Sequence, residues 1–175
     1  MTKFVVPHDP NWKTSFEIEA QSIANSIGKG KISLHHIGST AITGILAKPI
    51  IDLLGIVSNL DVLDARTNDM KALGYEVMGA YGIEGRRYFR KFDATGRRTH
   101  HLHVFADNSP HIERHLAFRD YLNSHSEVAT QYSDLKALLT RETSSSWEDY
   151  MDGKDPFIAV VKKDAVKWCR RNQRG

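Results

Sequence analysis

The first third of the chain alternates between helix-like and strand-like spacing of its apolar residues. After Pro10, apolar residues recur at approximate helical spacing until Gly28 and Gly30 interrupt the pattern, which predicts a first helix. The segment KISLHHIG is predicted to be a short strand. The segment PIIDLLGIV is predicted to be a second strand, and its nearly continuous apolar character indicates burial on both faces.

The middle of the chain adds a helix and three strands. A helix is expected from Ser58 to Leu73, with Ser58 or Asn59 as its cap and Gly74 closing it. The segments YEVMG, RRYFRKF and HHLHVFA are strand candidates, and GIEG and DATGRR are turn-rich connections. Together with the two earlier strands, they predict one sheet.

The last third of the chain is predicted to be helical. Ser109 and Pro110 form a cap followed by a first-turn proline, which predicts a helix over HIERHLAFRDYLNSH. Further helices are expected over about 127–140 and 155–171, with TRETSSSWED as a loop between them. This order is typical of an α+β fold with one mixed sheet, flanking helices and a helical C-terminal part. Residues 1–175 are expected to form one domain.

Composition and charge narrow the classes of function. The 175 residues are 41% hydrophobic and 26% charged, which is ordinary for a globular protein. The net charge of +3 is too small to indicate a nucleic-acid or membrane partner by itself. The single cysteine, Cys169, rules out a disulfide within the chain and a cysteine-rich zinc site, and fits a reducing compartment. Without a signal-peptide pattern or a run of roughly 18 apolar residues, a cytoplasmic protein is expected.

The segment HHIGSTAITGILAKPIIDLLG holds the first candidate site. Gly38 ends a strand, and Ser39 and Thr40 are expected to cap a short helix that reaches about Leu46. Free backbone N–H groups at such a helix start bind anions, phosphate above all, and the two hydroxyls add donors. The alternative is a simple turn with a cap.

Asp52 interrupts the apolar strand PIIDLLGIV. An ionised acid in a buried strand is costly unless it is paired, hydrogen-bonded or metal-bound. Strand alternation places Ile50, Asp52 and Leu54 on one face. Asp52 is therefore a candidate metal ligand and catalytic residue near the Gly-Ser corner. The alternative is a salt bridge with Lys48 or an arginine.

Two histidines form a second candidate cluster. On the segment HHLHVF, His101 and His103 point the same way, with Leu102 and Val104 opposite. Two imidazoles at this spacing suit a divalent metal or a phosphate, so both are candidate metal and catalytic residues beside Asp52. The alternative is a pair of partly buried histidines hydrogen-bonded to the backbone.

Basic residues supply candidate phosphate contacts. The planar fork of arginine suits phosphate, and Arg86 and Arg87 begin the strand RRYFRKF. Alternation places Arg86, Tyr88 and Arg90 on one face and Arg87 on the other. Lys48 offers a further point charge. The alternative for the arginines is a solvated strand face.

Arg119 and Asp120 are neighbours on a predicted helix and therefore should not face each other. Each is expected to pair elsewhere, either in an ion pair that docks the helix on the sheet or with a ligand.

Six segments occur in an order that is specific as a set: HIGSTAITGILAKPIIDLLG, LGYE, RRYFRKF, THHLHV, HLAFRDYL and YSDLKALL. Over about Val6 to Phe157 the chain resembles the GrpB family, which also occurs as a domain fused to bacterial dephospho-coenzyme A kinases. The resemblance implies the nucleotidyltransferase superfamily fold of polymerase-beta-like enzymes, a small mixed sheet with helices on it and extra helices after it. Lys136 and Lys154 also match positions of the family, either as cleft residues or as surface charge.

The resemblance also implies a site. In the superfamily, a Gly-Ser pair holds the phosphates of a nucleotide, and three acids hold two magnesium ions. Gly38 and Ser39 match the pair, and Asp52 matches the second acid. Ile50 replaces the first acid, and a histidine of HLHV falls near the third. Such a donor set suits manganese, zinc, iron or nickel better than the usual Mg²⁺, and a divalent metal (Mn²⁺, Mg²⁺ or Zn²⁺) is the expected cofactor.

The function that follows is binding of a nucleotide or another phosphorylated small molecule together with a divalent metal. If the chain is an enzyme, the reaction implied is nucleotidyl transfer. Two alternatives stay open: a non-catalytic nucleotide- or partner-binding module with a degenerate site, and a metal-dependent hydrolase built on the His and Asp residues.

Overall fold

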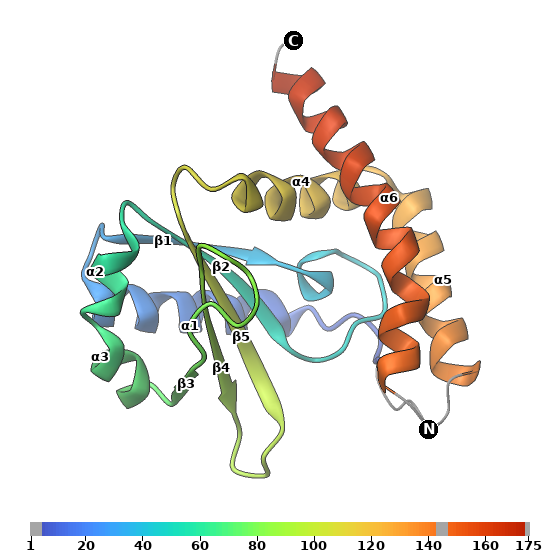
Figure 1. Ribbon diagram of the computed structural model, residues 1–175. Coiled ribbons are helices and arrows are strands. Elements are labelled where there is room, and N and C mark those ends of the chain that lie inside the picture. The colour runs from blue at the N-terminus through green and yellow to red at the C-terminus, as the bar shows by residue number, and fades with distance from the viewer. Residues whose placement is uncertain (1–4, 143–146, 174–175) are drawn as a thin grey trace.

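The computed structural model describes residues 5–142 and 147–173, and its centre is a mixed five-stranded sheet (Figure 1). In spatial order the strands run β1-β2-β5-β4-β3, with β2 and β5 parallel and the other neighbours antiparallel. All five predicted strands are present. They are β1 (Ile32–Ile37), β2 (Ile51–Val57), β3 (Tyr75–Val77), β4 (Arg86–Phe92) and β5 (Arg98–Ala106).

Helices flank the sheet and then form a group of their own, so the predicted α+β class is confirmed (Figure 1). The helices are α1 (Asn11–Ile27), the 3-10 helix η1 (Ser39–Ala41), α2 (Leu60–Asp64), α3 (Thr67–Ala72), α4 (Pro110–Ser124), α5 (Ser126–Glu142) and α6 (Trp147–Gln173). Ser109 caps α4 as predicted, because its side chain accepts a hydrogen bond from the N–H of His111.

The two faces of the sheet are covered differently. Helices α1, α2 and α3 pack on one face and form the main hydrophobic core with side chains such as Leu53 and Leu102, both fully buried. Helix α4 packs on the other face, over a smaller cluster that contains Leu54 and Phe105. Asp52 alternates with Leu53 along β2, so it lies on the α4 side.

The segment after η1 connects the sheet to the helical part. Ile42 and Ile45 are buried in a cluster with side chains of α4, α5 and α6. The N–H of Thr43 donates to Asn123 Oδ1 at 3.1 Å, and Asn123 Nδ2 donates to Ala41 O at the same distance. Residues 39–45 are therefore held directly against α4.

The helix predicted over 58–73 is two short helices. Asn59 caps α2 by accepting from the N–H of Asp61. The break follows Asp64, whose backbone carbonyl accepts a hydrogen bond from Thr67 Oγ1 at 2.8 Å. A threonine hydroxyl that bonds locally to the backbone competes with helix continuation, which the helical spacing alone did not reveal.

Two other predicted boundaries were wrong. Helix α6 begins at Trp147, eight residues before the expected start, and Pro156 lies inside it. Tyr150 is only 2% exposed, so the turns before the proline have buried contacts of their own. The helix expected over 39–46 is only the three residues of η1. The predicted loop TRETSSSWED falls partly outside the described residues, and its described parts extend α5 and α6.

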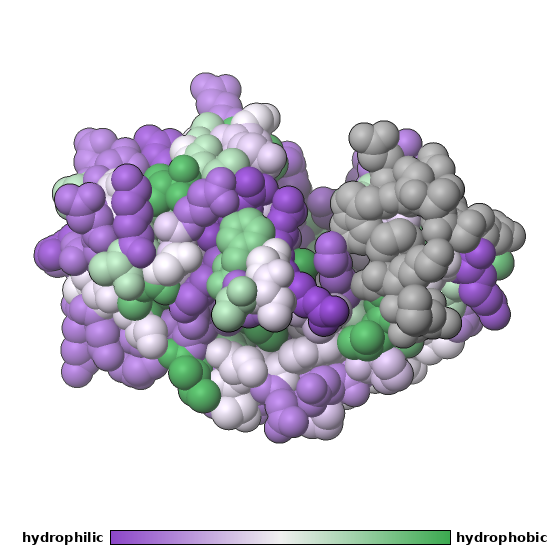
Figure 2. Space-filling model, turned by 90° about the horizontal axis from the view of Figure 1, so that it is seen from below, coloured by the Kyte–Doolittle hydropathy of each residue, from purple (hydrophilic) through white to green (hydrophobic). Residues whose placement is uncertain are grey.

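The surface is polar over most of the side seen in Figure 2, where hydrophobic side chains are scattered among hydrophilic ones. Among the described helices, none has both the length and the apolar character needed to cross a membrane.

Candidate functional site

The Gly-Ser corner and Asp52 are in contact. Strand β1 ends at Ile37, whose partner across the antiparallel pair is Asp52. Gly38 follows with φ 74° and ψ −172°, a backbone region that is essentially restricted to glycine. A Cβ built on Gly38 would lie 2.7 Å from Asp52 Oδ2. The corner therefore needs glycine both for its backbone angles and for the approach of the acid.

Asp52 also meets the two histidines of the HLH segment. On the parallel strands β2 and β5, Asp52 is the register partner of His101. The distance from Asp52 Oδ1 is 3.4 Å to His101 Nδ1 and 3.6 Å to His103 Nε2. Burial alone would raise the pKa of Asp52, but the two imidazoles hold that pKa well below its ordinary value. The carboxylate is therefore ionised at neutral pH.

Arg86 contacts the ring nitrogen of His103 that faces away from Asp52. Its guanidinium donates to Ala80 O at 3.2 Å and to Tyr81 O at 2.8 Å, and Nη1 lies 3.4 Å from His103 Nδ1. Because a guanidinium has only donors, the Nδ1 atom facing it acts as acceptor, and the ring proton belongs on Nε2, toward Asp52. These contacts use the side chain of Arg86, which is not brought to the cavity described below.

Arg87 lies on the opposite face of β4. Its guanidinium binds both carboxylate oxygens of Asp64, at 2.8 and 3.0 Å. This bidentate pair ties the strand to the end of α2. The structure therefore does not bring the sequence-predicted phosphate residue Arg87 to the site, because strand alternation points it away.

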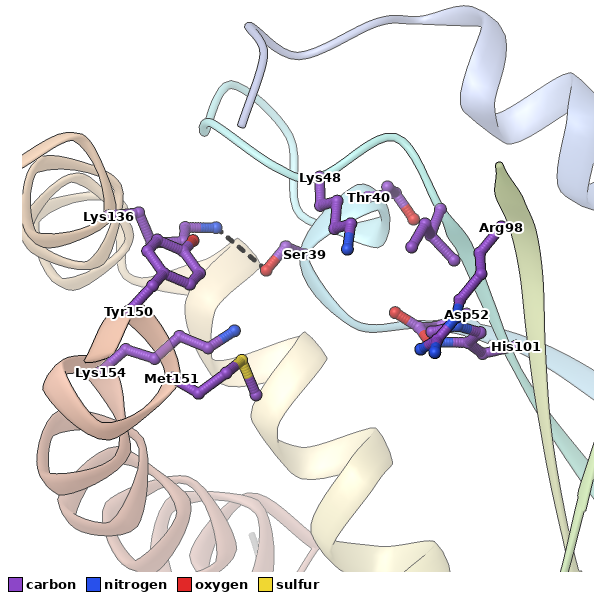
Figure 3. Close-up of a pocket in the computed structure, with 11 residues that line it drawn as sticks. Ser39, Thr40, Lys48, Asp52, Arg98, His101, Lys136, Tyr150, Met151 and Lys154 are labelled. Atoms are coloured by element: carbon purple, nitrogen blue, oxygen red, sulfur yellow. Dashed lines mark hydrogen bonds and ion pairs between the residues drawn. The ribbon is translucent and has the colours of Figure 1, made fainter. Parts of the chain in front are cut away.

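A cavity of about 210 Å³ lies between the sheet, α5 and α6, beside the Gly-Ser corner (Figure 3). Its lining includes five residues that the sequence predicts for the site: Ser39, Thr40, Lys48, Asp52 and His101. Its complete lining is Ser39, Thr40, Lys48, Ile50, Asp52, Arg98, His101, Lys136, Tyr150, Met151 and Lys154. Gly38 and His103 do not line the cavity, but both lie against Asp52, which does.

The lining is strongly cationic. Lys48, Arg98, Lys136 and Lys154 come from four separate segments of the chain and face one acid, Asp52. The pKa of Lys48 is lowered by burial and then by the charge of Arg98. The pKa of Lys154 is lowered by burial, against the attraction of Asp52. Such a concentration of positive charge in a partly enclosed space suits an anionic ligand.

Lys136 is the most buried of these cations, with 1% of its surface exposed. Its ammonium group donates to Ser39 Oγ at 3.0 Å and to the backbone carbonyl of Leu46, and lies 4.2 Å from the centroid of the Tyr132 ring. Burial, and then the charge of Lys154, lower the pKa of Lys136 to about 7. The sequence left Lys136 open between cleft and surface, and the structure places it in the cleft wall.

Three lining residues were not found from the sequence. Arg98 was assigned only to a turn, although it begins β5. Tyr150 and Met151 lie between the predicted loop TRETSSSWED and the expected start of the last helix, so no element was predicted for them. The one signal for them was the family match of nearby Lys154, which implied that this part of the chain could reach the cleft.

Arg119 departs from the expectation in two respects. Its Nε donates to Asp120 Oδ1 at 2.8 Å, so the two neighbours do pair, because a long arginine side chain can curl back along the helix. Its Nη1 donates to His36 O at 3.2 Å. Arg119 thus docks α4 on β1, but through a backbone carbonyl and not through the predicted ion pair with the sheet.

The donor set does not fit the metal site that the fold family implies. Ile50 occupies the place of one acid, and His103 directs its ring proton rather than a lone pair toward Asp52. The buried Nε2 of His101 has no hydrogen-bond partner among the described residues, but it points away from the carboxylate contact made by Nδ1. Across residues 5–142 and 147–173, no group of three or more His, Cys, Asp or Glu side chains is arranged to hold a metal ion.

Comparison with known proteins shows the family to which the chain belongs. The model of the family described as GrpB protein matches residues 3–164. The chain belongs to the GrpB family. The crystal structure of the conserved protein GrpB from Enterococcus faecalis is 41% identical, with a TM-score of 0.87 over 93% of this chain and 97% of that chain.

Curated relatives agree with this assignment. The glutamate-rich protein GrpB of Alkalihalophilus pseudofirmus is 35% identical over 90% of this chain and 92% of its own length. Protein YqkA of Bacillus subtilis is 39% identical, and this chain spans 47% of its length. A dephospho-CoA kinase of Mycobacterium tuberculosis is 24% identical over 94% of this chain, which spans 46% of the kinase. The GrpB unit thus also occurs within longer proteins.

More distant structures share the fold. The Cid1 poly(U) polymerase, in a structure with MgGTP bound, has a TM-score of 0.53 at 12% identity, over 77% of this chain and 45% of the polymerase. The GLD-2/RNP-8 complex gives 0.55 at 14% identity, over 79% and 57%. The predicted polymerase-beta-like nucleotidyltransferase fold is confirmed.

Proposed function

We propose that this GrpB-family protein binds a phosphorylated small molecule, with a nucleotide as the first candidate, in the cationic cavity beside the Gly-Ser corner. The observation that carries the proposal is the convergence of four cations around the hydroxyls of Ser39 and Thr40. Phosphate is the common ligand that combines several negative charges with several hydrogen-bond acceptors. A nucleotide comes first because the Cid1 polymerase, which shares the fold, carries bound MgGTP.

Each group has a role in this proposal. The hydroxyls of Ser39 and Thr40 donate to phosphate oxygens, and the lysines and Arg98 neutralise the charge. Lys136 holds Ser39 in place through its 3.0 Å hydrogen bond. Asp52 fixes the shape of the corner through Gly38 and offers an acceptor to a ligand hydroxyl. Because the donor set does not fit a metal, no step is assigned to one.

The experiment is calorimetric titration of the chain with ATP. Lys154→Met is the test variant, and Lys162→Met is its matched control, because Lys162 also lies on α6 but does not line the cavity. We expect Lys154→Met to weaken binding by about tenfold, which corresponds to the loss of one charged contact, and the control to bind like the parent. Equal affinity in the parent and both variants, or no binding by the parent, would contradict the proposal.

Nucleotidyl transfer is a second candidate, favoured by the contact between Asp52 and the Gly-Ser corner. It requires an acceptor whose hydroxyl attacks the α-phosphorus of the nucleotide, releasing pyrophosphate. Incubation with labelled nucleotide and a cell extract tests this candidate. A labelled product that is lost in both Ser39→Ala and Asp52→Asn supports transfer, whereas tight binding without product supports a non-catalytic module.

A further inference from the structure

The size of the cavity limits what it can enclose. Its volume of about 210 Å³ is below the roughly 300–1,000 Å³ of sites that enclose a drug-sized ligand. All four cations of the lining and the hydroxyls of Ser39 and Thr40 surround this one small space. The cavity therefore has room for a short phosphate chain but does not enclose a whole nucleotide.

Two tyrosine rings beside the cavity are already covered by lysine side chains. Lys154 Nζ lies 5.1 Å from the centroid of the Tyr150 ring, and Lys136 Nζ lies 4.2 Å from that of Tyr132. Both rings are buried, with 2% and 3% of their surfaces exposed. A nucleobase is usually held by stacking on an open aromatic face. These two rings instead support the ammonium groups that face the phosphate site.

The charge of the lining matches an oligophosphate. Four cations and one carboxylate give the cavity a formal charge of +3 when every lysine is protonated. In the superfamily's usual site, divalent cations held by carboxylates neutralise the phosphates. In this chain Ile50 stands in place of one of those acids and a histidine of HLHV falls near another, and the remaining acid, Asp52, is engaged by two imidazoles. The lining of this chain therefore carries fixed side-chain cations and only one of the acids that hold divalent ions in the usual site.

On the basis of the function proposed above, we infer that the cavity recognises an oligophosphate chain itself, without a divalent metal. The ligand class comprises free pyrophosphate or tripolyphosphate and the phosphate tail of a nucleotide, which present the same chemistry to the lining. The nucleoside of a nucleotide ligand then lies outside the enclosed space and contributes little affinity.

Calorimetric titrations at constant ionic strength test this inference. The probes are sodium tripolyphosphate, pyrophosphate, ATP and adenosine, each in EDTA and then in excess Mg²⁺. We expect tripolyphosphate to bind in EDTA within about threefold of ATP, adenosine not to bind, and Mg²⁺ to weaken both phosphate ligands by competing for their oxygens. Lys154→Met should weaken tripolyphosphate and ATP equally, and Lys162→Met should weaken neither.

Two results separate this inference from the proposed function. If ATP binds at least about tenfold more tightly than tripolyphosphate, or binds only with Mg²⁺, metal-free recognition of the phosphate chain is wrong and nucleotide binding stands. If no phosphate ligand binds under either condition, both are wrong. Similar affinity for tripolyphosphate and ATP in EDTA supports both, and the pyrophosphate titration then tells how many phosphates the lining contacts.

Discussion

A β-carbon at Gly38 would fall 2.7 Å from Asp52 Oδ2, well inside van der Waals contact. The end of β1 and the start of β2 therefore approach each other through a glycine and an acid that leave no room for a side chain between them. This contact sets the position of Ser39 and Thr40 relative to the cationic lining.

Substitution of Gly38 by alanine should cost both stability and binding. The backbone angles at Gly38 are strained for alanine, and the methyl group displaces Asp52, so a loss of about 2–4 kcal/mol in the free energy of unfolding is expected. Gly96 is the matched control, because it has a φ of 83° but no atom within 4 Å of the place that a β-carbon would take. Gly96→Ala should lose about 1 kcal/mol and bind ATP normally. Urea denaturation and calorimetry measure both quantities, and equal losses in the two variants would contradict the contact.

Binding should weaken as the pH rises above neutrality. The pKa of Lys136 is about 7 in the free protein, and a bound phosphate favours its charged form. The site therefore takes up a proton on binding, and the affinity falls with rising pH by up to about tenfold per pH unit. The ligand changes little over this range, because the second pKa of a phosphate group is about 6. Calorimetric titrations with ATP from roughly pH 7 to pH 9 measure how steeply the affinity depends on pH. A Lys136→Met variant with the same slope as the parent would show that another group is responsible.

The protein should lose stability in mild acid because of His115. This residue of α4 stacks against the sheet, 5.7 Å from His103 and 6.0 Å from Phe105 between ring centroids. Burial, and then the charges of His103 and Lys162, lower its pKa to about 3. The unfolded chain binds a proton below about pH 6.5, whereas the folded chain binds it only near pH 3. The free energy of unfolding should therefore fall as the pH drops through this window, by up to about 1.4 kcal/mol per pH unit.

Urea denaturation at a series of pH values checks this prediction. His115→Phe should show a shallower dependence of stability on pH, whatever its stability at neutral pH. The comparison of slopes is informative because a packing change shifts stability at every pH alike. Parallel curves for the parent and His115→Phe would assign the acid sensitivity to other groups.

Substitutions of Arg98 and Arg87 should have different effects on the binding of ATP. Arg98 lines the cavity, whereas Arg87 makes a bidentate pair with Asp64 on the opposite face. Arg98→Ala should weaken ATP binding by about tenfold or more. Arg87→Ala should leave binding unchanged and cost only about 0–1 kcal/mol of stability, because its partner is nearly half exposed. If Arg87→Ala is the variant that loses binding, the ligand lies on the α2 side of the sheet.

The purified protein should carry a divalent metal at well below one equivalent per chain. Asp52 Oδ1 lies 3.6 Å from His103 Nε2, and the other ring nitrogen of His103 faces Arg86, so the two sides of this imidazole are already occupied. Elemental analysis of freshly prepared protein measures the content, and EDTA should leave the melting temperature unchanged. Stoichiometric zinc or manganese that is lost in both Asp52→Asn and His103→Ala would instead establish the metal-dependent alternative.

The strands of the sheet could be predicted from the sequence because the pattern that indicates a strand is local. Runs such as PIIDLLGIV and HHLHVFA carry their own burial pattern, and the structure shows the same strands. The divided helix around Asp64 and the early start of α6 depend on particular contacts, a threonine hydroxyl and the burial of Tyr150. Such contacts override the spacing of apolar residues, so the pattern alone misplaced these boundaries.

The contacts of Asp52 with the two histidines were predictable because these residues share neighbouring strands. Asp52, His101 and His103 meet because β2 and β5 are in register, and strand alternation already aligned the two histidines. The position of Arg86 on that face was also correct, but its donors are used by Ala80 and Tyr81. The contribution of Tyr150 and Met151 depends on how α6 packs, and no local pattern encodes that arrangement.

The hydrogen bond between Ser39 and Lys136 spans 97 residues of sequence. A phosphate that contacts both residues would join two parts of the molecule, since one wall of its seat belongs to the sheet half and the other to the helical half. Ligand occupancy would then raise the cooperativity of unfolding, and neither half expressed alone could form the seat.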